Sequence, residues 1–206
     1  MPMFPLGSVL FPHMPLPLRV FEERYLIMLS QLVKVEDGRF GVVLIERGFE
    51  VGGGEQRYGV GTAAEVTQLG AAEGMVGLVA QGRERIQVAE WLPDDPYPRA
   101  EVETLPELVW DGTLETLRTE TEQLVRRSIA QASEFAELIW PADVELSEDP
   151  VAALWQLAAI APLTAYDQVA LLRASTAEGL LTTLAQLTRD AAVAWQIAWP
   201  DDEPSV

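Results

Sequence analysis

The first residues of the chain, MPMFPLGSVLFPHMPLPLRVFEERY (Met1–Tyr25), form the stretch that decides the fold. Apolar side chains are interspersed there with prolines at positions 5, 12, 15 and 17. Because proline has no backbone N–H and a fixed φ, the stretch is excluded from a helix interior and from a central strand. We predict four elements in order: a strand over Ser8–Phe11, a stiff extended crossing over Pro12–Pro17, a strand over Leu18–Phe21 and a helix over Glu22–Val35.

Further short strands follow this helix as far as Leu105. Apolar and β-branched runs bounded by glycine or proline turns are typical of strands. Several short strands with one early helix favour a compact, partly closed barrel. The predicted strands are Arg39–Glu46, Tyr58–Leu69, Met75–Gln81, Arg83–Trp91 and Arg99–Leu105.

After Pro106 the apolar residues recur at spacings of three and four, as in amphipathic helices. Asp149 is a predicted N-cap followed by proline in the first helical position, and Thr164 and Thr176 are predicted caps. The predicted helices are Thr113–Ala136, Pro150–Ala161, Ala165–Ala174 and Ala177–Ala198. We therefore expect an α+β protein with these parts: a barrel in residues 1–106, a helical bundle in residues 107–200 and a disordered tail in residues 201–206.

The opening motif also resembles a known family. PLGSVLFPHMPLPLRVFEERY (Pro5–Tyr25) is similar to the start of the Lon protease N-terminal, substrate-binding domain. Two later segments, YGVGTAAEV (Tyr58–Val66) and GRERIQV (Gly82–Val88), resemble strands of that family, and Asp149–Leu184 resembles its helical tail. The resemblance implies that the barrel is similar to the PUA fold.

The resemblance implies a protein that recognises unfolded or degron-bearing polypeptides, with a full-length Lon protease as a second partner. We expect a stand-alone recognition protein that acts as an adaptor or regulator of proteolysis and is not an enzyme. An ATPase module needs a G-x-x-x-x-G-K-[ST] loop and a Ser–Lys protease needs a lysine of lowered pKa. The single lysine, Lys34, follows no glycine loop and lies near Glu36 and Asp37.

No catalytic group, metal or cofactor is predicted. His13 is the single histidine and the chain has no cysteine, so a small hydrolase built on a nucleophile–base pair is disfavoured. The absence of cysteine and of a signal sequence fits a cytoplasmic protein. No apolar run is long enough to span a membrane, so we expect no membrane partner.

The net charge of −18 bears on the alternative ligands. Residues 1–105 hold 9 basic and 15 acidic side chains, and the remainder holds 5 and 17. Basic side chains supply most of the affinity for nucleic acid, so we expect no nucleic-acid partner. The alternative interpretation, a PUA-like module that binds a small molecule or RNA, stays open because a fold does not fix its ligand.

A polypeptide client is expected to bind an exposed apolar surface. Val9, Leu10, Val20 and Phe21 are expected in the core. Met28, Met75, Trp140 and Trp199 are each expected in the core when taken singly. As a group they are candidates for this surface, because methionines repack readily against varied partners and a contiguous exposed patch marks a binding site. The predicted substrate-binding residues are Met14, Leu16, Arg24 and Tyr25.

Overall fold

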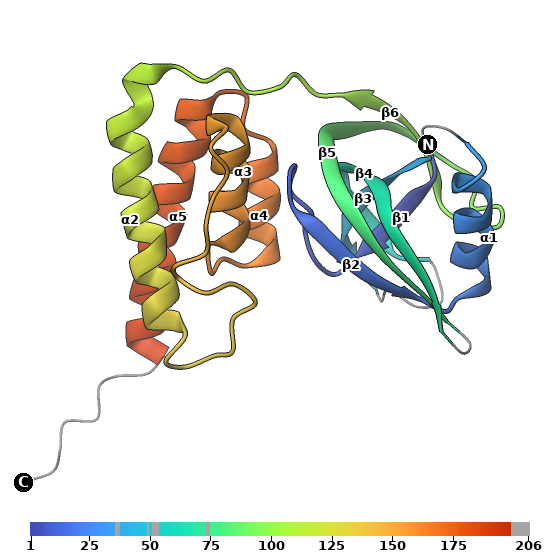
Figure 1. Ribbon diagram of the computed structural model, residues 1–206, viewed down its shortest axis with the longest axis horizontal. Helices are drawn as coiled ribbons and strands as arrows, with labels where there is room; N and C mark the ends of the chain where they lie inside the picture. Colours follow the sequence, from blue (N-terminus) through green and yellow to red (C-terminus); the bar gives the residue numbers. More distant parts are fainter. Residues whose placement is uncertain (36–37, 49, 51–53, 73–74, 199–206) are drawn as a thin grey trace, which may run out of the picture. The chain divides into compact units, whose positions relative to one another are not determined.

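The computed structural model describes residues 1–35, 38–48, 50, 54–72 and 75–198 (Figure 1). Contacts between Cα atoms divide the chain into two compact units, Met1–Glu107 and a second that begins at Leu108. We call them the sheet unit and the helical unit. The predicted tail over residues 201–206 lies outside the described residues.

The sheet unit contains one six-stranded sheet. The hydrogen-bonded order is β1-β3-β4-β5-β2, and β6 pairs with the second half of β5. β1 is parallel to β3, and the other pairs are antiparallel. The strands are β1 (Met3–Leu6), β2 (Pro15–Val20), β3 (Arg39–Arg47), β4 (Gln56–Ala72), β5 (Met75–Leu92) and β6 (Arg99–Thr104).

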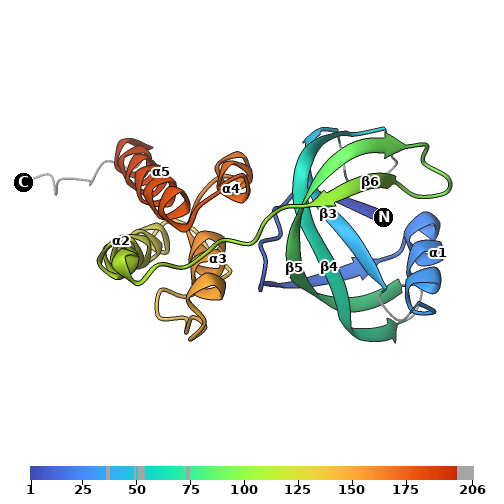
Figure 2. The ribbon, with the colours of Figure 1, turned by 90° about the horizontal axis from the view of Figure 1, so that it is seen from above.

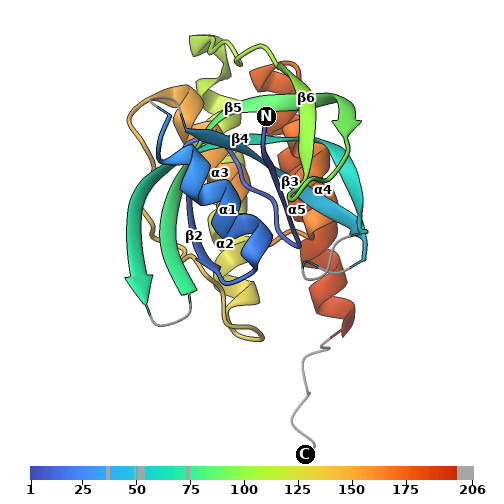
Figure 3. The ribbon, with the colours of Figure 1, turned by 90° about the vertical axis from the view of Figure 1, so that its right-hand side faces the viewer.

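Helix α1 (Glu23–Leu32) lies on one side of the curved sheet (Figures 2 and 3). The ring of Tyr25 stacks on Phe4 of β1, with 4.1 Å between the ring centroids. The Tyr97 hydroxyl donates to Oε1 of Gln31 at 2.5 Å. One cluster of buried side chains joins five strands, with one residue from each of β1, β3, β4, β5 and β6, namely Met3, Val43, Ala63, Ile86 and Ala100.

Three strand predictions for this unit are wrong. The first strand is Met3–Leu6 instead of Ser8–Phe11, because β1 pairs with β3 while the carbonyl of Leu10 accepts the Thr62 hydroxyl at 2.6 Å. The second strand, β2, begins at Pro15 and ends at Val20, where an extended crossing over Pro12–Pro17 and a strand over Leu18–Phe21 are predicted. β5 is continuous where two strands separated at Gly82 are predicted. Gly82 is there because the backbone passes close by: a Cβ at this position would lie 2.2 Å from the carbonyl oxygen of Phe11.

The helical unit contains α2 (Glu115–Ala132), α3 (Pro150–Ile160), α4 (Ala165–Leu172) and α5 (Ala177–Ala198). α2 and α5 pack side by side (Figures 1 and 2). All three predicted caps are confirmed, since their side-chain oxygens accept from backbone N–H groups at 2.7 Å for Asp149, 3.2 Å for Thr164 and 3.0 Å for Thr176. α2 ends four residues before the predicted end at Ala136.

The α+β class is confirmed, while the finer description as a partly closed barrel followed by a bundle stays a prediction. Within the described ranges, no helix combines the length and the apolar character needed to cross a membrane. The same ranges hold no cluster of three or more His, Asp or Glu side chains placed to bind a metal ion.

Candidate functional site

Strand β2 lies at an edge of the sheet, and its prolines are placed accordingly. The N–H of Gly82 donates to the carbonyl of Met14 at 2.9 Å, and the register with β5 continues from there along β2 without a shift. Backbone polar groups alternate sides along a strand, so the even-numbered residues face β5 and the odd-numbered residues face outward. Pro15 and Pro17 therefore stand where an N–H would be unpaired, which disfavours addition of a further strand.

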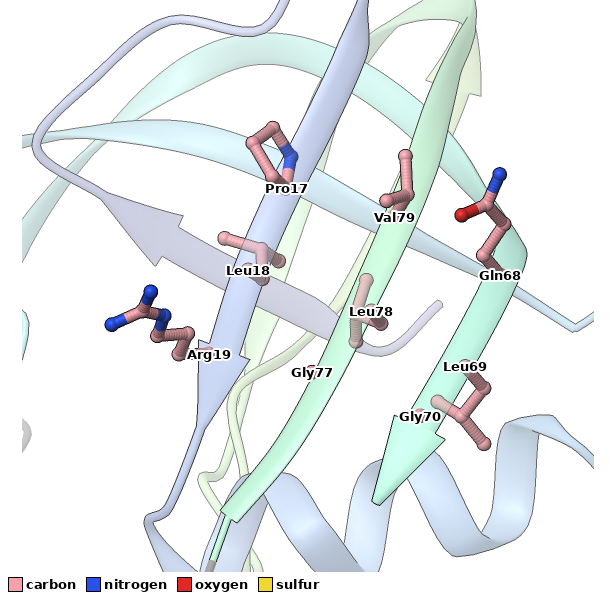
Figure 4. Close-up of a pocket in the computed structure, with 9 residues that line it drawn as sticks. All are labelled: Pro17, Leu18, Arg19, Gln68, Leu69, Gly70, Gly77, Leu78 and Val79. Atoms are coloured by element: carbon pink, nitrogen blue, oxygen red, sulfur yellow. The ribbon is translucent and has the colours of Figure 1, made fainter. Parts of the chain in front are cut away.

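A groove of about 680 Å³ crosses β2, β5 and β4 (Figure 4). The strand register arranges its lining in three rows, and the lining is apolar except for one guanidinium and one side-chain amide. We call this surface the β2 groove. Its rows are Pro17, Val79 and Gln68; Leu18, Leu78 and Leu69; and Arg19, Gly77 and Gly70.

Gly70 and Gly77 leave the β2 groove open at one end. A Cβ built on Gly70 would lie 4.0 Å from the carbonyl oxygen of Gly77, and one on Gly77 would lie 3.9 Å from that of Gly70. The backbone thus has room for a side chain at both positions, and the space exists because glycine has none. Leu69 beside them is 53% exposed, so an apolar group that docks here would remove a large side chain from water.

Arg19 supplies the charge of the β2 groove. Its side chain is exposed, and no salt bridge to it is found within the described part of the chain. Other arginines of the sheet unit are paired: Arg39 with Glu84 at 2.7 Å, for example. Among the described residues, Arg19 is therefore available to pair with a carboxylate of a bound molecule.

A smaller hollow of about 180 Å³ adjoins the β2 groove and shares Pro17–Arg19 with it. Its other lining residues include Phe4 and Leu6 of β1, so it lies between the two strands that end the hydrogen-bonded order. Tyr25 from α1 also lines it. Burial raises the pKa of Tyr25 well above its usual range, against the lowering effect of Arg24, so the phenol stays neutral.

The four predicted substrate-binding residues differ in burial and in their contacts. Met14 is buried, and Tyr25 is buried except where it lines the smaller hollow. Leu16 is half-buried on β2, one residue before the β2 groove. The Arg24 guanidinium pairs with Glu22 at 3.1 Å and lies 4.5 Å from the centroid of the Tyr25 ring. Their role as client contacts stays a prediction.

One core assignment is wrong. Phe21 is 57% exposed although it is predicted in the core, because Val20 before it points inward and strand side chains alternate. Met28 is fully buried, as expected for this residue taken singly, because it lies three residues after Tyr25 on the same helix face. Trp140 is half-buried, whereas Trp199 lies outside the described residues.

The sequence reasoning missed the residues of the β2 groove. Gly70 and Gly77 are paired in the observed register of β4 and β5, whereas the predicted strands, which end at Leu69 and begin at Met75, leave Gly70 outside them. Pro15 and Pro17 occupy alternate positions, which an edge strand can accommodate. Nothing in the local sequence indicates that the neighbouring strand is β5.

The sequence of the chain is similar to that of a known protein family over most of its length. Residues 1–189 match the family model of the ATP-dependent protease La (LON) substrate-binding domain. The Lon protease of Anaeromyxobacter dehalogenans is 33% identical over 151 residues, which are 68% of this chain and 18% of that protein. Lon protease 1 of Herpetosiphon aurantiacus is 28% identical over 204 residues, 90% of this chain and 23% of that protein. The chain thus spans less than a quarter of the length of these relatives.

Two solved structures show the same fold. A Lon N-terminal domain protein from Xanthomonas campestris superposes with a TM-score of 0.61 at 21% identity, covering 97% of both chains. The N-terminal domain of the Mycobacterium avium complex Lon protease superposes with a TM-score of 0.66 at 18% identity, covering 92% of this chain and 97% of that one.

Proposed function

The chain belongs to the family of LON substrate-binding domains, and we propose that it binds polypeptide clients in the β2 groove without catalysing a reaction. The observation that carries this proposal is an open, largely apolar groove whose floor is widened by two glycines. Binding sites are concave and mostly apolar, with few polar groups that fix orientation. The β2 groove has this composition, with Arg19 and Gln68 as its polar side chains.

The dimensions of the β2 groove suit a short extended segment. Adjacent strands are about 4.8 Å apart, so crossing from β2 through β5 to β4 covers about 10 Å, or about three extended residues. Apolar side chains of the client would cover Leu69 and fill the space above Gly70 and Gly77. A carboxylate of the client would pair with Arg19, which makes an apolar segment with one acidic residue the best match.

The wider role follows the family. We propose that the clients are unfolded or degron-bearing segments and that the chain serves proteolysis as an adaptor or regulator, with a Lon protease as partner. Leu16 and Tyr25 would extend the contact along β2 and into the smaller hollow. The alternative of RNA is less well supported, because neutralising phosphates requires several basic side chains and the β2 groove has one.

Filling the β2 groove tests the proposal. The probe is a fluorescein-labelled twelve-residue peptide of Leu, Val and Ser with one central Asp, and binding is measured by fluorescence anisotropy. Gly77→Val should weaken binding about tenfold or more, because the new side chain occupies the space that the client needs. The matched control is Gly59→Val at the opposite end of β4, where the nearest group is the mobile end of the Gln87 side chain.

The charge is tested separately. Arg19→Gln should weaken binding of the Asp peptide about threefold and leave a peptide with Asn at that position unaffected, because exposed ion pairs contribute little. Near-UV circular dichroism verifies that each variant is folded. Equal affinity of Gly77→Val and the unsubstituted protein would remove the β2 groove as the client site.

A further inference from the structure

The connection between α2 and α3, residues 133–149, is a long segment without helix or strand (Figure 1). Side chains of both helices hydrogen-bond to its backbone. The Arg126 guanidinium of α2 donates to the carbonyl of Ala142 at 2.5 Å and to that of Val144 at 3.1 Å. Near α3, the N–H of Ser147 donates to Oε1 of Gln156 at 2.7 Å. Long ordered loops of this kind are usually functional.

Large apolar side chains on this connection face water. Ile139 is 88% exposed and Phe135 is 41% exposed, while Leu138 and Trp140 between and beside them are half-buried. The backbone is anchored on both sides, yet Ile139 is not turned toward the core. Apolar surface that a fixed backbone holds in water marks an interaction site.

The charged side chains of this connection all have one sign. No basic residue occurs between Arg127 and Arg173. Two arginines lie near the end of α2: Arg126 is bound to Glu122 at 2.9 Å and to the connection itself, and Arg127 is exposed. Residues 133–149, which we call the acidic–apolar loop, carry six exposed acidic side chains: Glu134, Glu137, Asp143, Glu145, Glu148 and Asp149.

We propose that the acidic–apolar loop docks a basic, apolar polypeptide segment of a partner protein. The apolar side chains of the partner would cover Ile139 and Phe135, and its Lys or Arg side chains would pair with the surrounding carboxylates. Charge complementarity favours a basic partner over a second copy of the chain or an anionic lipid surface, because both of these would bring further negative charge. The proposal is independent of the β2 groove, whose charge is Arg19 and of the opposite sign.

Matched peptides test the proposed partner chemistry. Three fluorescein-labelled twelve-residue peptides are compared by anisotropy with the full chain: one of Lys, Leu and Phe, one with Glu in place of Lys, and one with Ser in place of Leu and Phe. The first should bind at least about tenfold more tightly than either other peptide, and its affinity should fall as salt rises from 50 to 500 mM. Equal binding of the Glu peptide would overturn the proposal.

Variants locate the contact. Ile139→Ser should weaken binding of the Lys peptide about tenfold, whereas Val109→Ser, also in the helical unit and 82% exposed, should leave it unchanged. Glu137→Gln together with Glu145→Gln should weaken binding more than Glu101→Gln together with Glu103→Gln on β6. Gly77→Val in the β2 groove should leave the affinity for the Lys peptide unchanged. A loss of binding in the Val109 or β6 variants equal to that in the loop variants would show general attraction to an acidic protein and overturn the assignment.

Discussion

The sheet unit and the helical unit form their candidate binding surfaces in different ways. The β2 groove joins residues 17–19, 68–70 and 77–79, which only the register of three strands brings together. The acidic–apolar loop is one continuous segment between two helices. A surface built from distant segments depends on the whole sheet, whereas a continuous surface depends on its anchors.

One ion pair from each unit shows the same difference. In the sheet unit, Arg57 pairs with Asp94 at 2.6 Å across 37 residues of sequence, and its guanidinium lies 4.7 Å from the centroid of the Trp91 ring. In the helical unit, Arg118 pairs with Glu115 at 2.6 Å within one turn of α2. Pairs of the second kind support a helix wherever it lies, and pairs of the first kind exist only after the strands have met.

The largest effect on stability is expected in the helical unit, where it tests whether local interactions alone hold the helices. Trp155 of α3 is 2% exposed, and Trp155→Ala should lower the free energy of unfolding by about 4 kcal/mol because it leaves a large cavity. Urea unfolding followed by circular dichroism at 222 nm measures the change. Tyr166→Ala on α4, where the side chain is 60% exposed, is the control and should cost less than about 1 kcal/mol. Equal losses would mean that the helices are held by local interactions alone.

A smaller effect is expected within one strand of the sheet unit. Gly82→Ala should destabilise the sheet by about 3 kcal/mol, because its Cβ would overlap the carbonyl of Phe11. Gly77→Ala on the same strand β5 has free space and should change stability by less than about 0.5 kcal/mol. Hydrogen exchange of the β4 and β5 amides measures the change in stability of the sheet in each variant. Similar protection in the two variants would contradict the close approach at Gly82.

The smallest effect on stability is expected at the N-cap of α3, which is a local interaction. Asp149→Ala should cost about 1 kcal/mol, because the side chain caps α3 by accepting the N–H of Ala152. Asp149→Asn should restore most of the stability, since asparagine caps equally well without the charge. Thermal unfolding compares the two variants with Asp143→Ala, which removes an exposed carboxylate from the same loop. If Asn fails to restore stability, the charge and not the cap is responsible.

Local chemistry explains which parts of the fold were predictable. The caps at Asp149, Thr164 and Thr176 were correct because a cap bonds to N–H groups within three residues. The continuity of β5 through Gly82 was not predictable, since the reason for the glycine is a carbonyl contributed by Phe11, far away in sequence. For the candidate site, the prolines excluded a central strand, but the groove required the partners that β5 and β4 supply.

The sequence by itself determined the family, the α+β class, the helix caps and the acidic character, because motif, periodicity and charge are local or additive properties. The tertiary structure decided which apolar residues meet water: Phe21 and Ile139 are exposed while Met14 and Met28 are buried. It also decided that Gly70, Gly77 and Arg19 share one surface. These facts depend on strand register and on which helix face meets the sheet, and both are set by packing between segments distant in the chain.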